Sequence, residues 1–172
     1  FRPLRVLLLN CYILQYRPKN FKRKMETIKE IPALDTFSVR HPVLRPGKPI
    51  ETCHFEGDNS ESTKHFGLFS NEKLAGIASL FIHPTPFLEE KLQFQLRGMA
   101  ILPEFQKKGF GEALVKHAEN DARARGGKII WFNAREIAVG FYKKLGYEII
   151  GEPFDIAVIG KHYVMYKKLD TV

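Results

Sequence analysis

The sequence predicts a single α/β domain built on a mixed β-sheet with helices on both faces. The chain has 172 residues, of which 44% are hydrophobic, so it can bury a substantial core and is not disordered by composition. Strand-like apolar runs recur along it, and two of them are separated by a short turn, as in a hairpin. Another run leads through a glycine-rich turn directly into a segment with helical periodicity, which is the strand–loop–helix order of α/β folds.

The first half of the chain predicts strands interrupted by one helix. A proline can occupy the first position of a helix, so Pro32 favours a helix start there. Further prolines after His41 break that pattern, and Asn71-Glu72 is a natural hairpin turn. The predicted elements are a strand at 26–31, a helix at 32–41, a loop at 57–62 and strands at 65–70 and 74–82.

The second half predicts a long helix and a short one among further strands. Three acid-first pairs four residues apart support the long helix, and Gly126 suits its C-cap. The pairs are Glu112/Lys116, Glu119/Arg123 and Asp121/Arg125. The predicted elements are a strand from 92 to 101, a helix at 109–125, a strand at 128–132, a short helix at 137–145 and strands near 147–150 and 162–167.

The turn from Gln106 to Gly111 joins a strand to a helix and is the most informative segment. Gly109 and Gly111 allow a tight turn and close approach to a ligand. The free N–H groups at a helix start favour an anion such as phosphate, and Lys107 and Lys108 add positive charge. The segment lacks the Gly-Lys-Ser/Thr end of a P-loop and the third glycine of a dinucleotide fingerprint.

A second segment, Ala138 to Tyr147, strengthens the prediction that the turn binds a phosphate group. Phe141 to Tyr147 resembles the Phe-Tyr-x-x-x-Gly-Phe signature of the GNAT superfamily of acyl-CoA N-acyltransferases, with tyrosine for the last phenylalanine. Gln106 to Gly111 resembles the loop of that superfamily that binds the coenzyme A pyrophosphate, and Arg97 to Pro103 resembles the strand before it. The resemblance covers residues 63–167 and extends back to residue 26. It implies a mostly antiparallel, twisted sheet of about six to seven strands.

The resemblance also implies an activity. The expected reaction transfers an acetyl group from acetyl-CoA to a primary amine of a small molecule or protein by direct attack, with no metal. A non-catalytic domain that binds or senses acyl-CoA is the alternative. The residues expected at the coenzyme A site are Met99, Ile101, Gln106, Lys107, Lys108, Gly109, Phe110, Gly111, Asn133 and Tyr142. Asn133 could instead cap a turn, and Gln106 is expected to orient the loop.

Tyr142 is the expected general acid for the departing thiolate. A phenol with a pKa of ~10 stays protonated at neutral pH and can donate to a thiolate. Many family members use a carboxylate on the strand before the loop as the general base. Here that strand offers Gln93, Gln95 and Arg97, and no acidic residue. The alternation of these three side chains predicts a polar face open to substrate or solvent. Arg97 could bind an acidic acceptor group or form a surface ion pair, and it is named here as the candidate substrate-binding residue.

The general base therefore stays open at the level of sequence. His162 follows a glycine-containing loop and precedes a terminal strand that could border the acceptor cleft, so it is expected to act as the base or contact the acceptor. His83, Asp155 and a water chain are the alternatives.

The charge distribution argues against nucleic acid as a partner. The formal net charge is +8, but residues 1–24 hold seven basic residues and no acid. The remaining chain has 20 basic and 19 acidic residues, so it presents no broad surface for phosphate backbones. We expect residues 1–24 to be a non-native or extension segment, and residues 25–172 to form the domain, starting at Met25.

The cysteines and the hydropathy complete the expectations from sequence. Cys11 and Cys53 form no metal or redox motif, which suits a reducing cytoplasm. No stretch approaches the ~20 apolar residues of a membrane span. The expected partner is thus the amine acceptor, with neither nucleic acid nor membrane, and a homodimer is possible.

Overall fold

The computed structural model describes residues 26–157 and 159–169, so the predicted extension at 1–24 and the start at Met25 lie outside it. The described strands form one sheet in the order β1-β2-β3-β4-β5-β7-β6, and only β4 and β5 run parallel. The strands are β1 (Glu26–Glu30), β2 (Lys64–Ser70), β3 (Lys73–Ile82), β4 (Gln93–Ile101), β5 (Ile129–Arg135), β6 (Glu148–Ile156) and β7 (Gly160–Lys168). The predicted fold class is confirmed.

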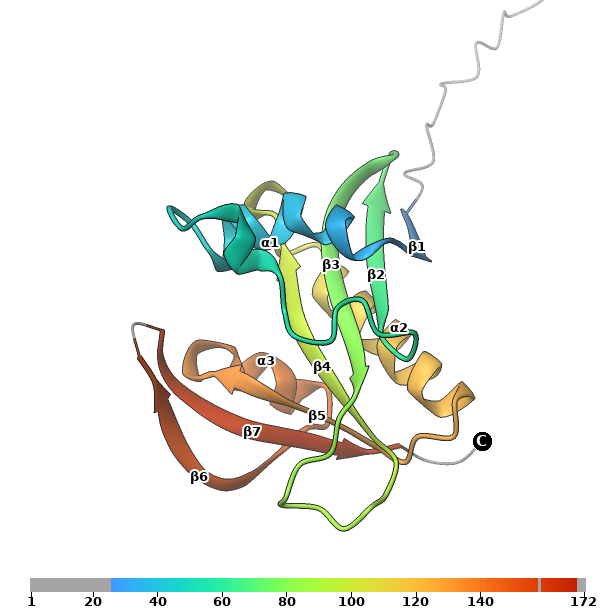
Figure 1. The fold of residues 1–172 in the computed structure, drawn as a ribbon, viewed down its shortest axis with the longest axis vertical. Coiled ribbons are helices and arrows are strands. Elements are labelled where there is room, and N and C mark those ends of the chain that lie inside the picture. Colours follow the sequence, from blue (N-terminus) through green and yellow to red (C-terminus); the bar gives the residue numbers. More distant parts are fainter. Residues whose placement is uncertain (1–25, 158, 170–172) are drawn as a thin grey trace, which may run out of the picture.

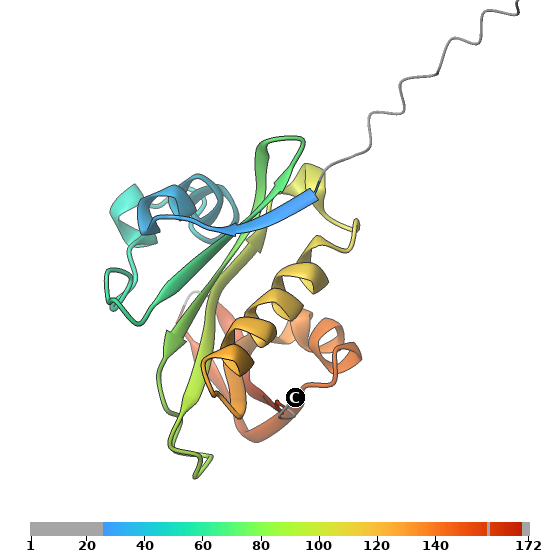
Figure 2. The same cartoon turned by 90° about the vertical axis from the view of Figure 1, so that its right-hand side faces the viewer.

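Helices cover both faces of this sheet (Figures 1 and 2). Helix α1 (Phe37–Leu44) lies on one face, and α2 (Phe110–Ala124) and α3 (Val139–Lys144) lie on the other. Short 3-10 helices flank them at η1 (Ala33–Thr36), η2 (Ile50–Cys53), η3 (Pro103–Phe105) and η4 (Glu136–Ala138). The two faces of the sheet are therefore covered by different helices.

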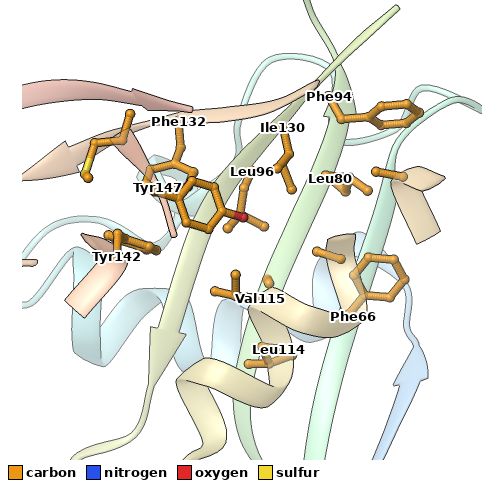
Figure 3. Close-up of a cluster of buried hydrophobic side chains, with 14 of the residues drawn as sticks. Phe66, Leu80, Phe94, Leu96, Leu114, Val115, Ile130, Phe132, Tyr142 and Tyr147 are labelled. Atoms are coloured by element: carbon orange, nitrogen blue, oxygen red, sulfur yellow. The ribbon is translucent and has the colours of Figure 1, made fainter. Parts of the chain in front are cut away.

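The main core lies between the sheet and the helices α2 and α3 (Figure 3). The apolar stripe of α2, including Phe110 and Leu114, packs there against Phe66, Leu80 and Phe94 from three strands. A second cluster of Ile31, Val39, Ile77 and Ala100 lies under α1. Burial of side chains of this size contributes about 1.5–3 kcal/mol each, so both faces of β3 and β4 are firmly held.

The long helix α2 forms as its sequence predicts. All three acid-first pairs are ion pairs, with nitrogen–oxygen distances of 2.6 Å for Glu112–Lys116 and 3.4 Å for both Glu119–Arg123 and Asp121–Arg125. Gly126 follows the helix with a φ of +79°, the left-handed conformation of a C-terminal glycine.

Three predicted boundaries were wrong, and one of them is the end of β5, which continues past 132 to Arg135. Helix α1 continues through Pro42 to Leu44, because its buried residues Val39 and Arg40 anchor it to the sheet and outweigh the one lost backbone bond. Strand β6 extends past Ile150 to Ile156, since a break in register between Ile150 and Phe154 absorbs the glycine and proline that suggested a strand end. The short helix η2 was not predicted.

Candidate functional site

The sheet opens between its two parallel strands. β4 pairs with β5 only through Gln93–Gln95 opposite Ile129–Trp131. Beyond these residues β4 continues beside β3, and β5 continues beside β7. The edge of β4 that faces β5 therefore carries backbone groups without a strand partner from Leu96 onward, and such groups can bind an extended ligand.

A bulge in β4 widens this opening. Ile77 lies opposite Ala100 and Ser79 opposite Arg97, so Gly98 and Met99 together face one residue of β3. Gly98 has a φ of +60°, and an added Cβ would lie only 2.8 Å from the Phe55 ring. Glycine is needed here both for the backbone conformation and for the close approach of Phe55.

A cavity of about 390 Å³ occupies the opening. Its walls come from β4, β5, the end of α1, the start of α3 and the β6–β7 turn. Because α1 and α3 cover opposite faces (Figure 2), the cavity leads from one face of the sheet toward the other. The lining residues used below are Arg45, Phe55, Arg97, Met99, Asn133, Arg135, Tyr142 and His162.

The glycine loop lies at the end of β4 and begins α2. Two of its residues, Lys107 and Gly109, have positive φ values of 58° and 81°, and alternating backbone of this kind forms a nest for anions. Gly109 is the N-cap of α2 and provides no side-chain hydrogen bond to the first turn. The N–H groups of Gly111 and Glu112 lack intrahelical acceptors because they lie in that first turn. The loop can thus receive an anion such as a diphosphate.

The other loop residues have structural contacts. Gln106 donates through Nε2 to the Ile101 carbonyl at 3.1 Å, which ties the loop to the end of β4. The Lys108 ammonium donates to the Glu104 carbonyl. The Phe110 ring is buried and stacks on Phe105. The Phe110 side chain is therefore part of the core and is not available to a ligand.

Tyr142 lies on α3 and lines the cavity with its ring packed into the core (Figure 3). Its centroid is 4.1 Å from that of Phe132, and its hydroxyl donates to the Met99 sulfur at 3.8 Å. Burial raises the pKa of this phenol above its ordinary value, so it stays protonated at neutral pH. A thioether is a weak acceptor, so the Tyr142 proton remains available to a stronger acceptor such as a thiolate.

His162 also lines the cavity, on β7 opposite Arg135 of β5. Its Nδ1 lies 2.7 Å from the Gly160 carbonyl oxygen. A carbonyl oxygen only accepts, so Nδ1 carries the hydrogen, and in a neutral imidazole Nε2 then holds the lone pair. This tautomer is the one that a general base requires.

Arg97 and Asn133 face the same cavity from β4 and β5. Arg97 donates to the Glu56 carbonyl at 3.2 Å and stacks over Phe81 at 4.6 Å from the ring centre. Burial lowers the pKa of Arg97, but a guanidinium stays charged at neutral pH. The two other proposed bases, His83 and Asp155, are exposed and do not line the cavity.

The predicted open polar face of β4 was wrong at Gln93. This side chain is 1% exposed. Its amide binds the Thr85 N–H and the carbonyls of Leu88 and Glu90, which fixes the β3–β4 loop. Gln95 is also buried, but it lines the cavity.

A buried ionic network behind the cavity wall was not predicted. Arg40 of α1 makes a bidentate pair with Asp58, at 2.6 and 3.0 Å, and both side chains are fully buried. Arg40 also donates to Ser79, which hydrogen-bonds with His65. The Asp58 carboxylate accepts from the backbone N–H of Phe55, whose ring lies 4.1 Å from the Arg40 guanidinium. The network thus fixes Phe55 in the wall of the cavity.

Metal binding and membrane insertion can be considered for the residues that the structure describes. Residues 26–157 and 159–169 contain no group of three histidine, cysteine or acidic side chains arranged to hold a metal ion. In the same ranges, no helix has the length and apolarity needed to cross a membrane.

Comparisons with known proteins agree with this geometry. Residues 26–147 match the acetyltransferase (GNAT) family. The chain is 42% identical over 147 residues to the uncharacterized N-acetyltransferase YitI of Bacillus subtilis (strain 168), which covers 86% of this chain and 99% of that protein.

Solved structures show the same fold at low identity. The ribosomal-protein-S18-alanine N-acetyltransferase from Escherichia coli is similar with a TM-score of 0.68 and 20% identity, over 86% of this chain and 96% of that one. An aminoglycoside 6'-N-acetyltransferase complexed with coenzyme A has a TM-score of 0.67 and 15% identity, over 84% and 97%.

Proposed function

The chain belongs to the acetyltransferase (GNAT) family, and from this premise we propose that it transfers the acetyl group of acetyl-CoA to an amine by direct attack in the cavity between β4 and β5. The observation that carries the proposal is the continuity of the site. The unpaired edge of β4 leads into a glycine loop that can receive an anion, and the Tyr142 hydroxyl contacts Met99 on the same strand. Acyl-CoA transfer can use all three features: the loop for the diphosphate, the free edge for the pantetheine amides and the phenol for the departing thiolate.

Acetyl-CoA fits the residues present and supplies a thioester carbonyl for attack and a thiolate that leaves. The backbone of 107–111 would hold the diphosphate. The free edge of β4 around Met99 and Ile101, with Asn133 across the opening, would hold the amides of the pantetheine arm. A backbone N–H of the same edge would stabilise the oxyanion.

The proton transfers assign roles to two side chains. Nε2 of His162, directly or through water, would remove a proton from the attacking amine. Tyr142 would donate its proton to the departing thiolate, since its buried phenol is neutral and its present acceptor is only a thioether. The acceptor would enter from the α1 face, opposite the glycine loop.

We also propose a cytoplasmic location. The cysteine described by the structure, Cys53, is a buried free thiol, which agrees with the proposed cytoplasmic setting. The predicted homodimer stays a prediction.

A thiol-release assay tests the function. The protein with acetyl-CoA and a panel of amines should release coenzyme A at a rate that depends on amine concentration, with N-acetylated product detected by mass spectrometry. If coenzyme A binds but no amine accelerates its release, the domain binds acyl-CoA without turnover and the proposed function is wrong.

Gly109→Val should weaken coenzyme A binding by about tenfold or more, because valine disfavours a φ of +81° and its side chain would fill space next to the nest. A Cβ at Gly109 would meet no atom of the protein within 4 Å, so the fold should persist. Calorimetry with coenzyme A measures the change. Gly140→Ala is the matched control, because its Cβ also has open space but its φ is not positive. Unchanged affinity in folded Gly109→Val would refute the placement.

A further inference from the structure

Three arginines converge on the acceptor side of the cavity. Arg45 ends α1, Arg97 lies on β4 and Arg135 ends β5, and all three line the opening. They come from separate segments of the chain, so their convergence is a property of the fold and not of a local charge run.

None of the three has a carboxylate partner among the described residues. Arg45 donates to the Leu44 carbonyl and Arg97 to the Glu56 carbonyl. Arg135 makes no side-chain hydrogen bond or ion pair within the described ranges, although it is only partly exposed. Partly buried guanidinium groups that lack an ion-pair partner are stabilised by a bound anion.

A second cavity of about 490 Å³ adjoins the first on the same side. The two share Val43, Leu44, Arg45, Arg135 and Ile159 as lining residues, and the second adds Lys48. Among the residues that the structure describes, no aspartate or glutamate lines either cavity. Each volume falls in the range of about 300–1,000 Å³ that binds small molecules. The surface is therefore small, cationic and free of the carboxylates that a polycationic acceptor would need.

Building on the proposed function, we propose that the acceptor is a small amine that carries an oxyanion, a carboxylate or a phosphate, bound by Arg45, Arg97 and Arg135. The planar guanidinium can bind either group through two parallel hydrogen bonds. This anchoring fixes the far end of the acceptor and leaves its amine directed toward the acetyl group. The same field of positive charge disfavours amines that carry additional positive charge.

Matched acceptor pairs test the inference. The pairs are 4-aminobutyrate with propylamine, O-phosphoethanolamine with ethanolamine, and L-lysine with cadaverine. We expect kcat/KM to be at least about tenfold higher for the member that carries the carboxylate or phosphate in one or more pairs, since a hydrogen bond to a charged group is stronger than one between neutral groups. The first two pairs distinguish carboxylate from phosphate.

Arg135→Gln should lower the preference for acceptors that carry a carboxylate or phosphate about tenfold. Arg135→Glu should reverse the preference between L-lysine and cadaverine in favour of cadaverine. Lys91→Gln removes an exposed positive charge outside both cavities and should leave the preference unchanged. Coenzyme A affinity, measured by calorimetry, should be the same in all three variants.

The outcomes separate this inference from the proposed function. Acetylation of the amines that lack an oxyanion, propylamine, ethanolamine and cadaverine, at equal or higher kcat/KM would overturn the inference and leave the transferase intact. If no amine of the panel is acetylated, the proposed transferase function fails, and binding of 4-aminobutyrate and O-phosphoethanolamine to the protein–coenzyme A complex tests the anion site by itself. Binding that Arg135→Gln weakens supports the inference, and no binding overturns it. A protein that does not bind coenzyme A at all refutes the function itself.

Discussion

Tyr142→Phe is expected to lower the turnover number roughly ten- to a thousandfold while coenzyme A affinity changes little. The substitution keeps the ring, which packs on Phe132 at a centroid distance of 4.1 Å, and removes only the hydroxyl. That hydroxyl has the Met99 sulfur as its protein partner, so the fold loses one weak hydrogen bond. We therefore expect the substitution to slow the chemical step and not to disturb the fold.

The measurement is turnover under conditions in which chemistry and not product release limits the rate. Tyr166→Phe is the control, because it also removes a phenol hydroxyl but one that donates to Glu148 at the exposed edge between β6 and β7. Near-normal turnover in Tyr142→Phe would show that the residue only packs against the core. A parallel loss in both variants would point to a general effect of removing hydroxyl groups.

Asp58→Ala is expected to destabilise the fold by about 3–5 kcal/mol, because it leaves the Arg40 guanidinium charged and buried without its partner. Urea unfolding at neutral pH measures the loss. Glu112→Ala breaks the exposed pair with Lys116 and should cost less than about 1 kcal/mol. The double variant Arg40→Leu/Asp58→Ala should be more stable than the sum of the two single changes predicts. A cost for Asp58→Ala no larger than that for Glu112→Ala would contradict this account.

The same pair makes stability depend on pH. Burial tends to raise the pKa of Asp58, but the hydrogen bonds from Arg40 and from the Phe55 N–H outweigh it, so the pKa is held below its usual value. A carboxylate with a lowered folded pKa adds stability above its unfolded pKa of about 3.9, and this stability is lost as pH falls through the folded value. The stability difference between the parent and Asp58→Asn should thus be largest near pH 7 and shrink below about pH 4. A constant difference down to acid pH would refute the assignment.

The sequence predicted those elements that depend on interactions between residues close together in the chain. The α2 helix follows from ion pairs four residues apart, and the glycine loop from two glycines between a strand and a helix. The β6 extension was missed because a glycine and a proline usually end a strand, while pairing with β7 across a bulge continues it. Gln93 resembled a surface residue because alternation along one strand cannot show that a loop folds over it.

The candidate site divides in the same way. Tyr142 and residues 106–111 lie in contiguous motifs and were predicted. Arg40 and Asp58 are 18 residues apart, and Arg40 and Ser79 are 39 apart, with no motif that joins them. The convergence of Arg45 and Arg135 with Arg97 likewise depends on how α1, β4 and β5 meet in space. Such constellations require the tertiary structure.

The passage of the cavity through the sheet has an evolutionary consequence. The groups proposed for acetyl-CoA lie in β4, the glycine loop, α3 and, at Asn133, the middle of β5, whereas the opposite mouth is formed by the end of α1, the end of β5 and the β6–β7 turn. Substitutions at the second mouth can therefore accumulate without disturbing the first, as loops on a rigid scaffold generally allow. Lineages of this fold can exchange acceptors while retaining the donor, so Arg45 and Arg135 mark where acceptor choice can diverge between otherwise similar chains.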